Sequence, residues 1–178
     1  MTKLKLKIHV KILRKPRASR SVEKMIKAMN DIYDAAKIDV ELASKEVLNA
    51  KEPGLAALND LDVGSCSWND LTDEQRDLAQ FRTGVPDREI VVYVCHSLSD
   101  AYGGCAVHPD GKPMAAISAR NARLYTLAHE VGHLLGLEHA ARDDQSLLMN
   151  ASGSPNLKPL PVLTQSEIDK MRKSPFLT

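Results

Sequence analysis

Residues 129–139 read His129-Glu130-Val131-Gly132-His133-Leu134-Leu135-Gly136-Leu137-Glu138-His139. The first two histidines lie four residues apart, so on a helix their imidazoles project from one face about one turn apart. Gly136 allows a sharp turn, which brings His139 round as a third ligand that a continuing helix would carry away. Three neutral imidazoles suit Zn²⁺ and leave the fourth position open, as in catalytic zinc sites. The spacing therefore predicts that His129, His133 and His139 bind one catalytic zinc ion.

Glu130 directly follows the first of these histidines. A carboxylate beside an open zinc position can act as a general base, which takes a proton from the attacking water and passes it to the leaving amine. The metal lowers the pKa of that water towards about 7 and polarises the scissile carbonyl. The predicted activity is that of a zinc-dependent endopeptidase with Glu130 as its catalytic residue.

Three other interpretations compete with this one. Histidines on an ordinary amphipathic helix would need no metal, but a chance match at five fixed positions has a probability on the order of 10⁻⁵ to 10⁻⁴ in a chain of this length. A catalytically silent zinc-binding module that recognises an extended peptide or partner protein would have no need of Glu130. An amidase for small non-peptide substrates would be favoured by a narrow cleft closed by residues 150–162.

The pattern along the rest of the chain predicts a mixed sheet with helices packed on it. Apolar residues alternate, as in strands, over 4–12 and 38–42, and a helical stripe lies between them over 22–36. Either Ser19 or Ser21 can cap this helix. Such a strand, helix, strand unit places its two strands parallel. His9 lies on the polar side of the first strand and is expected to face solvent.

Local signals place the remaining elements. Residues 44–70 show little periodicity and are expected to be irregular. Capping boxes begin short helices after Thr72 and Thr164. A helix over 121–135 is expected to end at Gly136. The expected strands are 90–95, which is apolar throughout and so covered on both faces, and 103–108 and 114–118, one of them at a sheet edge.

The composition suggests a single domain with a buried core. The chain has 178 residues, 43% of them hydrophobic, and 24 basic against 23 acidic residues give a net charge of +1. This balance disfavours nucleic-acid binding, and no run approaches the roughly 20 apolar residues that cross a bilayer. The alternating N-terminus lacks the apolar block of a signal peptide, which favours the cytoplasm; a trimmed piece of an exported precursor would instead be secreted. A monomer is expected.

Three cysteines allow at most one disulfide within the chain. Cys95 lies in the apolar strand and is expected to be an inert core thiol. Cys66 and Cys105 could pair, stay free or bind metal, and we expect free thiols. Trp68, the only tryptophan, is expected to pack rather than to bind a ligand.

Residues 129–139 match in full the signature H-E-x-x-H-x-x-G-x-x-H, so the sequence resembles the metzincin clan of zinc endopeptidases. The clan carries a methionine in a tight turn beneath the zinc, which the resemblance identifies as Met149. The short interval from His139 to Met149 is closest in outline to the matrixin branch. The resemblance implies an α+β fold and a single catalytic domain over 1–178. A mixed β-sheet and an active-site helix (about 1–136) would lie above the zinc cleft, and a small C-terminal subdomain (about 137–178) below it.

The resemblance also implies how a substrate binds. In the clan an edge strand above the cleft pairs with an extended peptide or protein segment, and Gly104, Cys105 and Ala106 stand where that strand would lie. Residues 150–162 would wall the pocket for the side chain that follows the cut. Calcium would follow only by analogy, because Asp143 and Asp144 alone do not form a binding loop.

Some positions depart from the family patterns. Ala140 follows the third histidine where matrixins usually carry serine, which leaves the subfamily open. No tyrosine follows Met149, so a tyrosine ligand of the astacin kind is not supported. His108 stands in a loop similar to the one that holds a structural zinc in matrixins, but companion ligands are missing and a second metal is not expected. His96 is expected to be an ordinary strand-end histidine.

Overall fold

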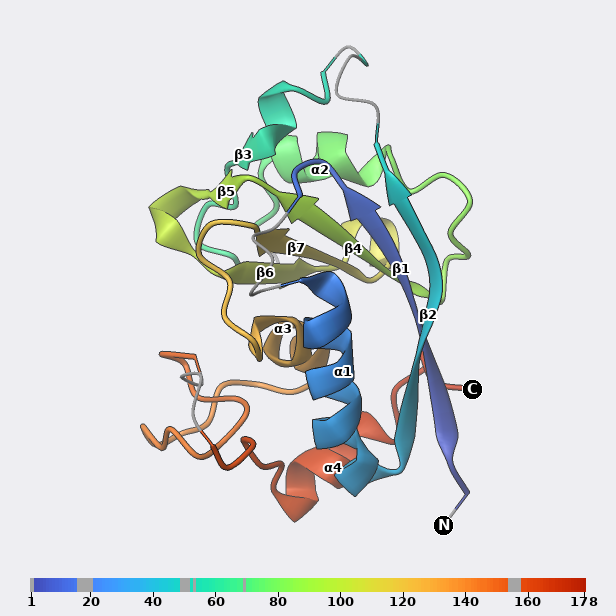
Figure 1. Cartoon of the computed structure of the whole chain (residues 1–178), viewed down its shortest axis with the longest axis vertical. Coiled ribbons are helices and arrows are strands. Elements are labelled where there is room, and N and C mark those ends of the chain that lie inside the picture. Colours follow the sequence, from blue (N-terminus) through green and yellow to red (C-terminus); the bar gives the residue numbers. More distant parts are fainter. Residues whose placement is uncertain (1, 16–20, 49–51, 53, 69, 154–157) are drawn as a thin grey trace.

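A mixed β-sheet is the scaffold of this computed structural model, which describes residues 2–15, 21–48, 52, 54–68, 70–153 and 158–178 (Figure 1). Its strands are β1 (Leu4–Ile12), β2 (Ile38–Val47), β4 (Ile90–Cys95), β6 (Gly104–Val107) and β7 (Met114–Ser118). They lie in the order β2-β1-β4-β7-β6. All neighbours are parallel except β6, which runs antiparallel to β7 at one edge. The predicted α+β class, parallel first unit and edge strand are confirmed.

Two helices cover one face of the sheet, below it in Figure 1: α1 (Val22–Tyr33) and α3 (Thr126–Leu134). Helix α2 (Asp73–Ala79) lies above the sheet, and α4 (Gln165–Met171) lies at the lower end of α1 (Figure 1). Within the described part of the chain, no helix has the length and apolar character needed to span a membrane. The short elements are β3 (Asp60–Leu61), β5 (Ser97–Leu98) and the 3-10 turns η2 (Asp34–Ala36), η3 (Ala57–Asn59), η4 (Ser99–Ala101) and η5 (Pro109–Gly111).

The sheet separates two hydrophobic cores. Every residue of β4 is at most 1% exposed, which confirms that this apolar strand is covered on both faces. On the lower side the alternate residues Leu6, Ile8 and Val10 of β1 pack with α1 and α3. On the upper side Val91 and Tyr93 of β4 belong to the second core. Because side chains alternate along a strand, one sheet serves both cores.

The helix ends follow the predicted local chemistry. Ser21 is the N-cap of α1 and accepts a hydrogen bond from Lys24 N, whereas Ser19 lies outside the described residues. Thr72 and Thr164 each begin a complete capping box, at α2 and α4. Helix α3 begins at Thr126 rather than at 121, because residues 119–125 form a turn-rich connection from β7.

The prediction that His9 faces solvent is wrong. Its side chain is buried on the upper side of the sheet, where Nδ1 lies 2.7 Å from Ser44 Oγ and Nε2 lies 2.6 Å from Glu89 Oε2. A register shift between Ile8 and His9 sets Ser44 opposite His9. The sequence indicated a half-buried strand, but β1 has a strand on each side and the connection before β4 covers its polar residues.

Two further expectations need correction. The segment 44–70 is only partly irregular, because β2 extends to Val47 and β3 pairs in parallel with β5. Cys66 and Cys105 are not free thiols but form a disulfide, whereas Cys95 is free and buried as predicted. The two disulfide partners lie 39 residues apart in sequence, so no local pattern brings them together.

The last residues of the chain add to the sheet beside the first half of β1. Lys5 N donates to Thr178 O at 2.7 Å, and Thr178 N donates to Lys5 O at 3.0 Å. An antiparallel bridge joins Leu6 to Leu177. These contacts occupy the side of β1 that β4, which pairs only from Ile8 onward, leaves unpaired.

The β1–β2 pair offers a matched test of the lower core. Ile8 is fully buried, and Leu42, its partner across the two strands, is 36% exposed. We expect Ile8→Ala to lower the free energy of unfolding by about 2–5 kcal/mol and Leu42→Ala by less than about 1 kcal/mol. Urea denaturation measures both, and equal losses would contradict the assignment of Ile8 to the core.

Candidate metal centre

Helix α3 and the turn that ends it bring three histidines together. His129 and His133 lie one turn apart on α3, and Gly136 follows the helix with φ +98°, a left-handed conformation that favours glycine. Gly136 N donates to His133 O at 2.8 Å and Leu137 N donates to Gly132 O at 3.0 Å, which closes the helix end. The chain then turns back and carries His139 to the other two, as the sequence predicted.

The three imidazoles meet through their Nε2 atoms. The pairwise Nε2–Nε2 distances are 3.1 Å for His129–His133 and 3.2 Å for the two pairs that include His139. Ligands at 2.0–2.1 Å in a tetrahedral zinc site lie about 3.3 Å apart, so the observed distances fit one ion. Among the residues that the structure describes, this is the one group of three or more metal-ligating side chains whose donor atoms converge in this way.

Backbone carbonyls fix the orientation of two of these rings. The Nδ1 of His129 lies 2.8 Å from Leu148 O, and that of His133 lies 2.9 Å from Leu137 O. A carbonyl oxygen only accepts, so both Nδ1 atoms donate and each neutral ring keeps its lone pair on Nε2. These partners could not be predicted from the sequence, because main-chain carbonyls carry no side-chain signal.

Burial keeps the three rings in the neutral form that binds metal. It lowers the pKa of His133 to about 4, and the pKa of His129 and of His139 also falls because the protonated ring loses solvation. In His129 and His133 the carbonyl partner opposes part of this shift. A metal ion therefore meets little competition from protons near neutral pH.

Met149 lies fully buried beneath α3. A Cβ at Gly132 would come 2.8 Å from Met149 Sδ, so the glycine lets the helix approach the methionine closely. Ala140 N donates to Met149 O at 2.8 Å, and Leu148 N donates to Val162 O at 3.0 Å. The segment around Met149 thus packs against α3 and supplies the carbonyl of Leu148 to His129.

Glu130 is buried between α3 and the edge strand. A Cβ at Gly104 of β6 would lie 2.5–2.9 Å from the Glu130 side chain, so this approach requires glycine. Burial raises the pKa of Glu130 from 4.5 to about 8. The hydroxyl of Tyr33, which donates to Ala128 O at 2.7 Å, is held in the same region and its pKa is raised by burial and by Glu130.

A cavity of about 310 Å³ opens beside the histidines. Gly104 lines it, as do His129, Glu130, His133 and His139, whereas Cys105 and Ala106 do not. The rest of the lining comes from the connections before β6 and α3 and from the segment after Met149: Asp100, Ala101, Tyr102, Gly103, Asn121, Arg123, Tyr125, Thr126, Ala151, Ser152 and Gly153. Only the last three had a sequence signal, as part of the predicted wall 150–162.

The other candidate residues lie outside this cavity. His108 packs between Trp68 and Phe176, at ring-centroid distances of 4.6 Å and 5.6 Å, so Trp68 packs as predicted although it is 42% exposed. His96 lines a different hollow beside Arg14. Asp143 accepts a hydrogen bond from Asn150 Nδ2, and Asp144 accepts from Ser146.

Comparison with known protein families identifies the family of this chain. Residues 19–140 match the family model described as Metallo-peptidase family M12B Reprolysin-like, which spans more than half of the chain and includes Glu130 and the three histidines. The chain belongs to this family. As a reprolysin-like protein it is a metzincin-type zinc metallopeptidase, which confirms the predicted clan. The closer likeness to matrixins stays a prediction.

Solved structures agree on the fold. Metalloproteinase-II from Bacteroides fragilis aligns over 94% of this chain with a TM-score of 0.65 and 18% identity, and the chain spans about half (52%) of its length. Mirolysin, solved in complex with compound 9, aligns over 97% of this chain and 91% of its own, with a TM-score of 0.64 and 14% identity. At such identities these likenesses establish the metzincin-like fold of the reprolysin-like chain.

Removal of one histidine should remove the metal. We expect His133→Ala to lower zinc affinity by more than about 100-fold, because even the loss of an outer hydrogen-bond partner costs about 10–100-fold. His96→Ala, which removes a histidine outside the cavity, should keep one zinc per chain. Zinc analysis after dialysis and calorimetric titration measure both variants. Equal zinc content in the two would contradict the ligand assignment.

The buried carboxyl of Glu130 should make the free energy of unfolding of the metal-free protein depend on pH. Because the folded pKa of Glu130 lies near 8, above its ordinary 4.5, its contribution to stability is complete at low pH and is lost as the pH rises through 8. We expect the free energy of unfolding of wild type relative to Glu130→Gln to fall by about 3 kcal/mol from pH 5 to pH 8. Urea titrations in a chelator measure this difference, in which the histidine contributions cancel. If the free energies of unfolding of the two proteins changed in parallel with pH, the prediction would be contradicted.

Proposed function

We propose that this reprolysin-like chain is a zinc-dependent endopeptidase that cleaves peptide or protein substrates bound in extended form. One observation carries the proposal: three Nε2 atoms converge beside the buried carboxyl of Glu130, on the wall of a cavity of about 310 Å³. A purely structural zinc site would need neither the cavity nor a carboxyl next to its ligands.

His129, His133 and His139 would hold the zinc. When bound, zinc polarises the scissile carbonyl and lowers the pKa of water. Glu130 accepts a proton from the attacking water and donates it to the leaving amine. In the metal-free chain burial raises the pKa of Glu130 to about 8, which favours the protonated form that donates to the leaving amine. The close approach of Gly104 excludes bulk water from one side of this carboxyl.

The cavity would take the residue that follows the cut. Ala151, Ser152 and Gly153 line it, which supports the wall that the family resemblance assigns to residues 150–162; residues 154–157 of that wall lie outside the described part of the chain. Gly104 brings the start of β6 to the same cavity, where its backbone can pair with an extended substrate.

The finer family likeness and the division of the chain belong to the same proposal. The hydrogen bond from Ala140 N to Met149 O closes the short interval between the third histidine and Met149, which supports a matrixin-like Met-turn. Residues 1–136 and 137–178 would form the upper and lower parts of one catalytic domain. Two ligands come from the upper part and His139 from the lower, so the zinc would join them.

A substitution of one atom tests the role of Glu130. Glu130→Gln keeps the shape of the side chain but cannot accept the proton, so we expect it to retain zinc and to lose at least about 100-fold in cleavage. Glu138→Gln is the matched control, because Glu138 is 88% exposed and pairs with Lys170 at the surface. Zinc analysis and chelator-sensitive cleavage of denatured casein and a peptide library measure both.

Two outcomes would count against the proposal. Full cleavage by Glu130→Gln would overturn the mechanism. Stoichiometric zinc in wild type without cleavage of any substrate in the library would favour the alternative, a silent zinc-binding module that recognises an extended peptide or partner protein.

A further inference from the structure

The edge strand β6 is covered although it has no neighbouring strand on its outer side. Cys105, Ala106 and Val107 are only 1–2% exposed, and Gly104 is buried as well. Ser118 N donates to Gly103 O at 2.9 Å across the β6–β7 ladder. Because hydrogen-bonded pairs alternate in an antiparallel ladder, the backbone groups of Gly104 and Ala106 point to the free edge. An edge strand normally leaves such groups open to a new strand.

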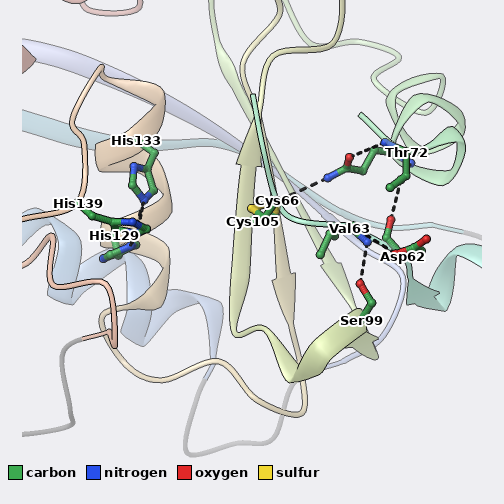
Figure 2. Close-up of a disulfide and its surroundings, with 11 residues drawn as sticks. Asp62, Val63, Cys66, Thr72, Ser99, Cys105, His129, His133 and His139 are labelled. Carbon is green, nitrogen blue, oxygen red and sulfur yellow. Dashed lines mark hydrogen bonds between the residues drawn. A yellow bond between two sulfur atoms is a disulfide. The ribbon is translucent and has the colours of Figure 1, made fainter. Parts of the chain in front are cut away.

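The segment Cys66–Trp68 is attached to β6 at two points. Cys66 is bonded to Cys105, with the two Cα atoms 5.7 Å apart. The ring of Trp68 packs on that of His108, the residue that follows β6. Figure 2 shows the disulfide between Asp62, Val63 and Thr72 on one side and the three histidines on the other. The segment therefore meets β6 at Cys105 and again just past its end, at His108.

The cavity beside the histidines reaches β6 only at its first residue. Its lining includes Gly104 and continues through Asp100–Gly103, but none of Cys105, Ala106 and Val107 belongs to it. The start of β6 is thus open to the cavity, whereas the residues that follow Gly104 are covered. The disulfide is attached at the first of these covered residues, Cys105.

We propose that the segment Cys66–Trp68, held by the Cys66–Cys105 disulfide, is a specificity wall that ends the substrate groove on the side preceding the cut. The inference rests on the proposed function, which places the residue after the cut in the cavity. Residues before the cut would run along β6 toward Val107, where the wall stands. Beyond about the second such residue, at about 3.4 Å per residue, the substrate has to leave the edge of the sheet.

This wall makes recognition one-sided. The protein selects peptides by the residues that follow the cut, because only that half of the substrate finds an open groove. Extension of a peptide beyond about two residues before the cut adds no strand pairing, whereas extension after the cut adds contacts with the cavity and with the 100–103 connection.

Two series of peptides around one cleaved bond test the inference, one lengthened from one to five residues before the cut and the other lengthened equally after it. For wild type we expect kcat/KM to rise with length after the cut and to stay constant beyond about two residues before it. Trp68→Ala and Cys66→Ser should each make kcat/KM rise by at least about tenfold on lengthening before the cut from two to five residues. Val47→Ala, an exposed change on the opposite edge strand, should behave as wild type.

Several outcomes decide between explanations. In wild type, an equal gain in kcat/KM from lengthening on both sides of the cut would overturn the proposed wall. So would the absence of a gain in Trp68→Ala from lengthening before the cut. Trp68→Ala keeps the disulfide, so it decides the matter if Cys66→Ser fails to fold. Absence of cleavage in wild type would count against the proposed endopeptidase alone. In that case the same peptides would be labelled with a fluorophore, and anisotropy would measure their affinity for zinc-loaded Glu130→Gln and for the Glu130→Gln, Trp68→Ala double variant. The two affinities would still show whether the wall limits binding on one side.

Discussion

Three imidazole nitrogens held 3.1–3.2 Å apart are the constraint on which the rest of the structure depends. The lone pairs of His129 and His133 face each other, an arrangement that a cation between them makes favourable. The chain nevertheless holds it through carbonyl partners at Leu137 and Leu148 and through the left-handed turn at Gly136. The end of α3, the returning loop and the segment around Met149 must therefore be fixed relative to each other, and the buried Met149–Gly132 contact joins two of them.

The edge strand β6 couples the base to the substrate groove. Gly104 gives Glu130 its space and lines the cavity, and the next residue carries the disulfide. The segment that restricts the groove is thus attached one residue away from the contact that positions the base. A shift of β6 would change both the environment of Glu130 and the access of a peptide, so specificity and catalysis share one strand.

The sequence predicted what is periodic or local. The His129–His133 spacing, the Gly136 turn, the capping boxes at Thr72 and Thr164 and the apolar strand all follow from rules that act within a few residues. What it could not predict depends on partners far away in the chain. Glu89 and Ser44 bury His9, the 60–72 region brings Cys66 to Cys105, and the carbonyls that orient the rings carry no residue signature. The cavity could not be predicted either, because residues from four separate connections line it.

The position of β1 at the interior of the sheet has a consequence for how the chain folds. Its partner β2 follows after one helix, so the β1–α1–β2 unit can form from contacts that are close in sequence. Its other partner, β4, pairs Ile90 with Ile8, and Thr178 completes the strand at Lys5. Such distant pairings raise the contact order and slow folding, since long loops must close before the contacts stabilise anything. Until β4 and the last residues pair with β1, one edge of β1 is open to pairing with another chain. The slow step in folding is therefore also the step most exposed to aggregation.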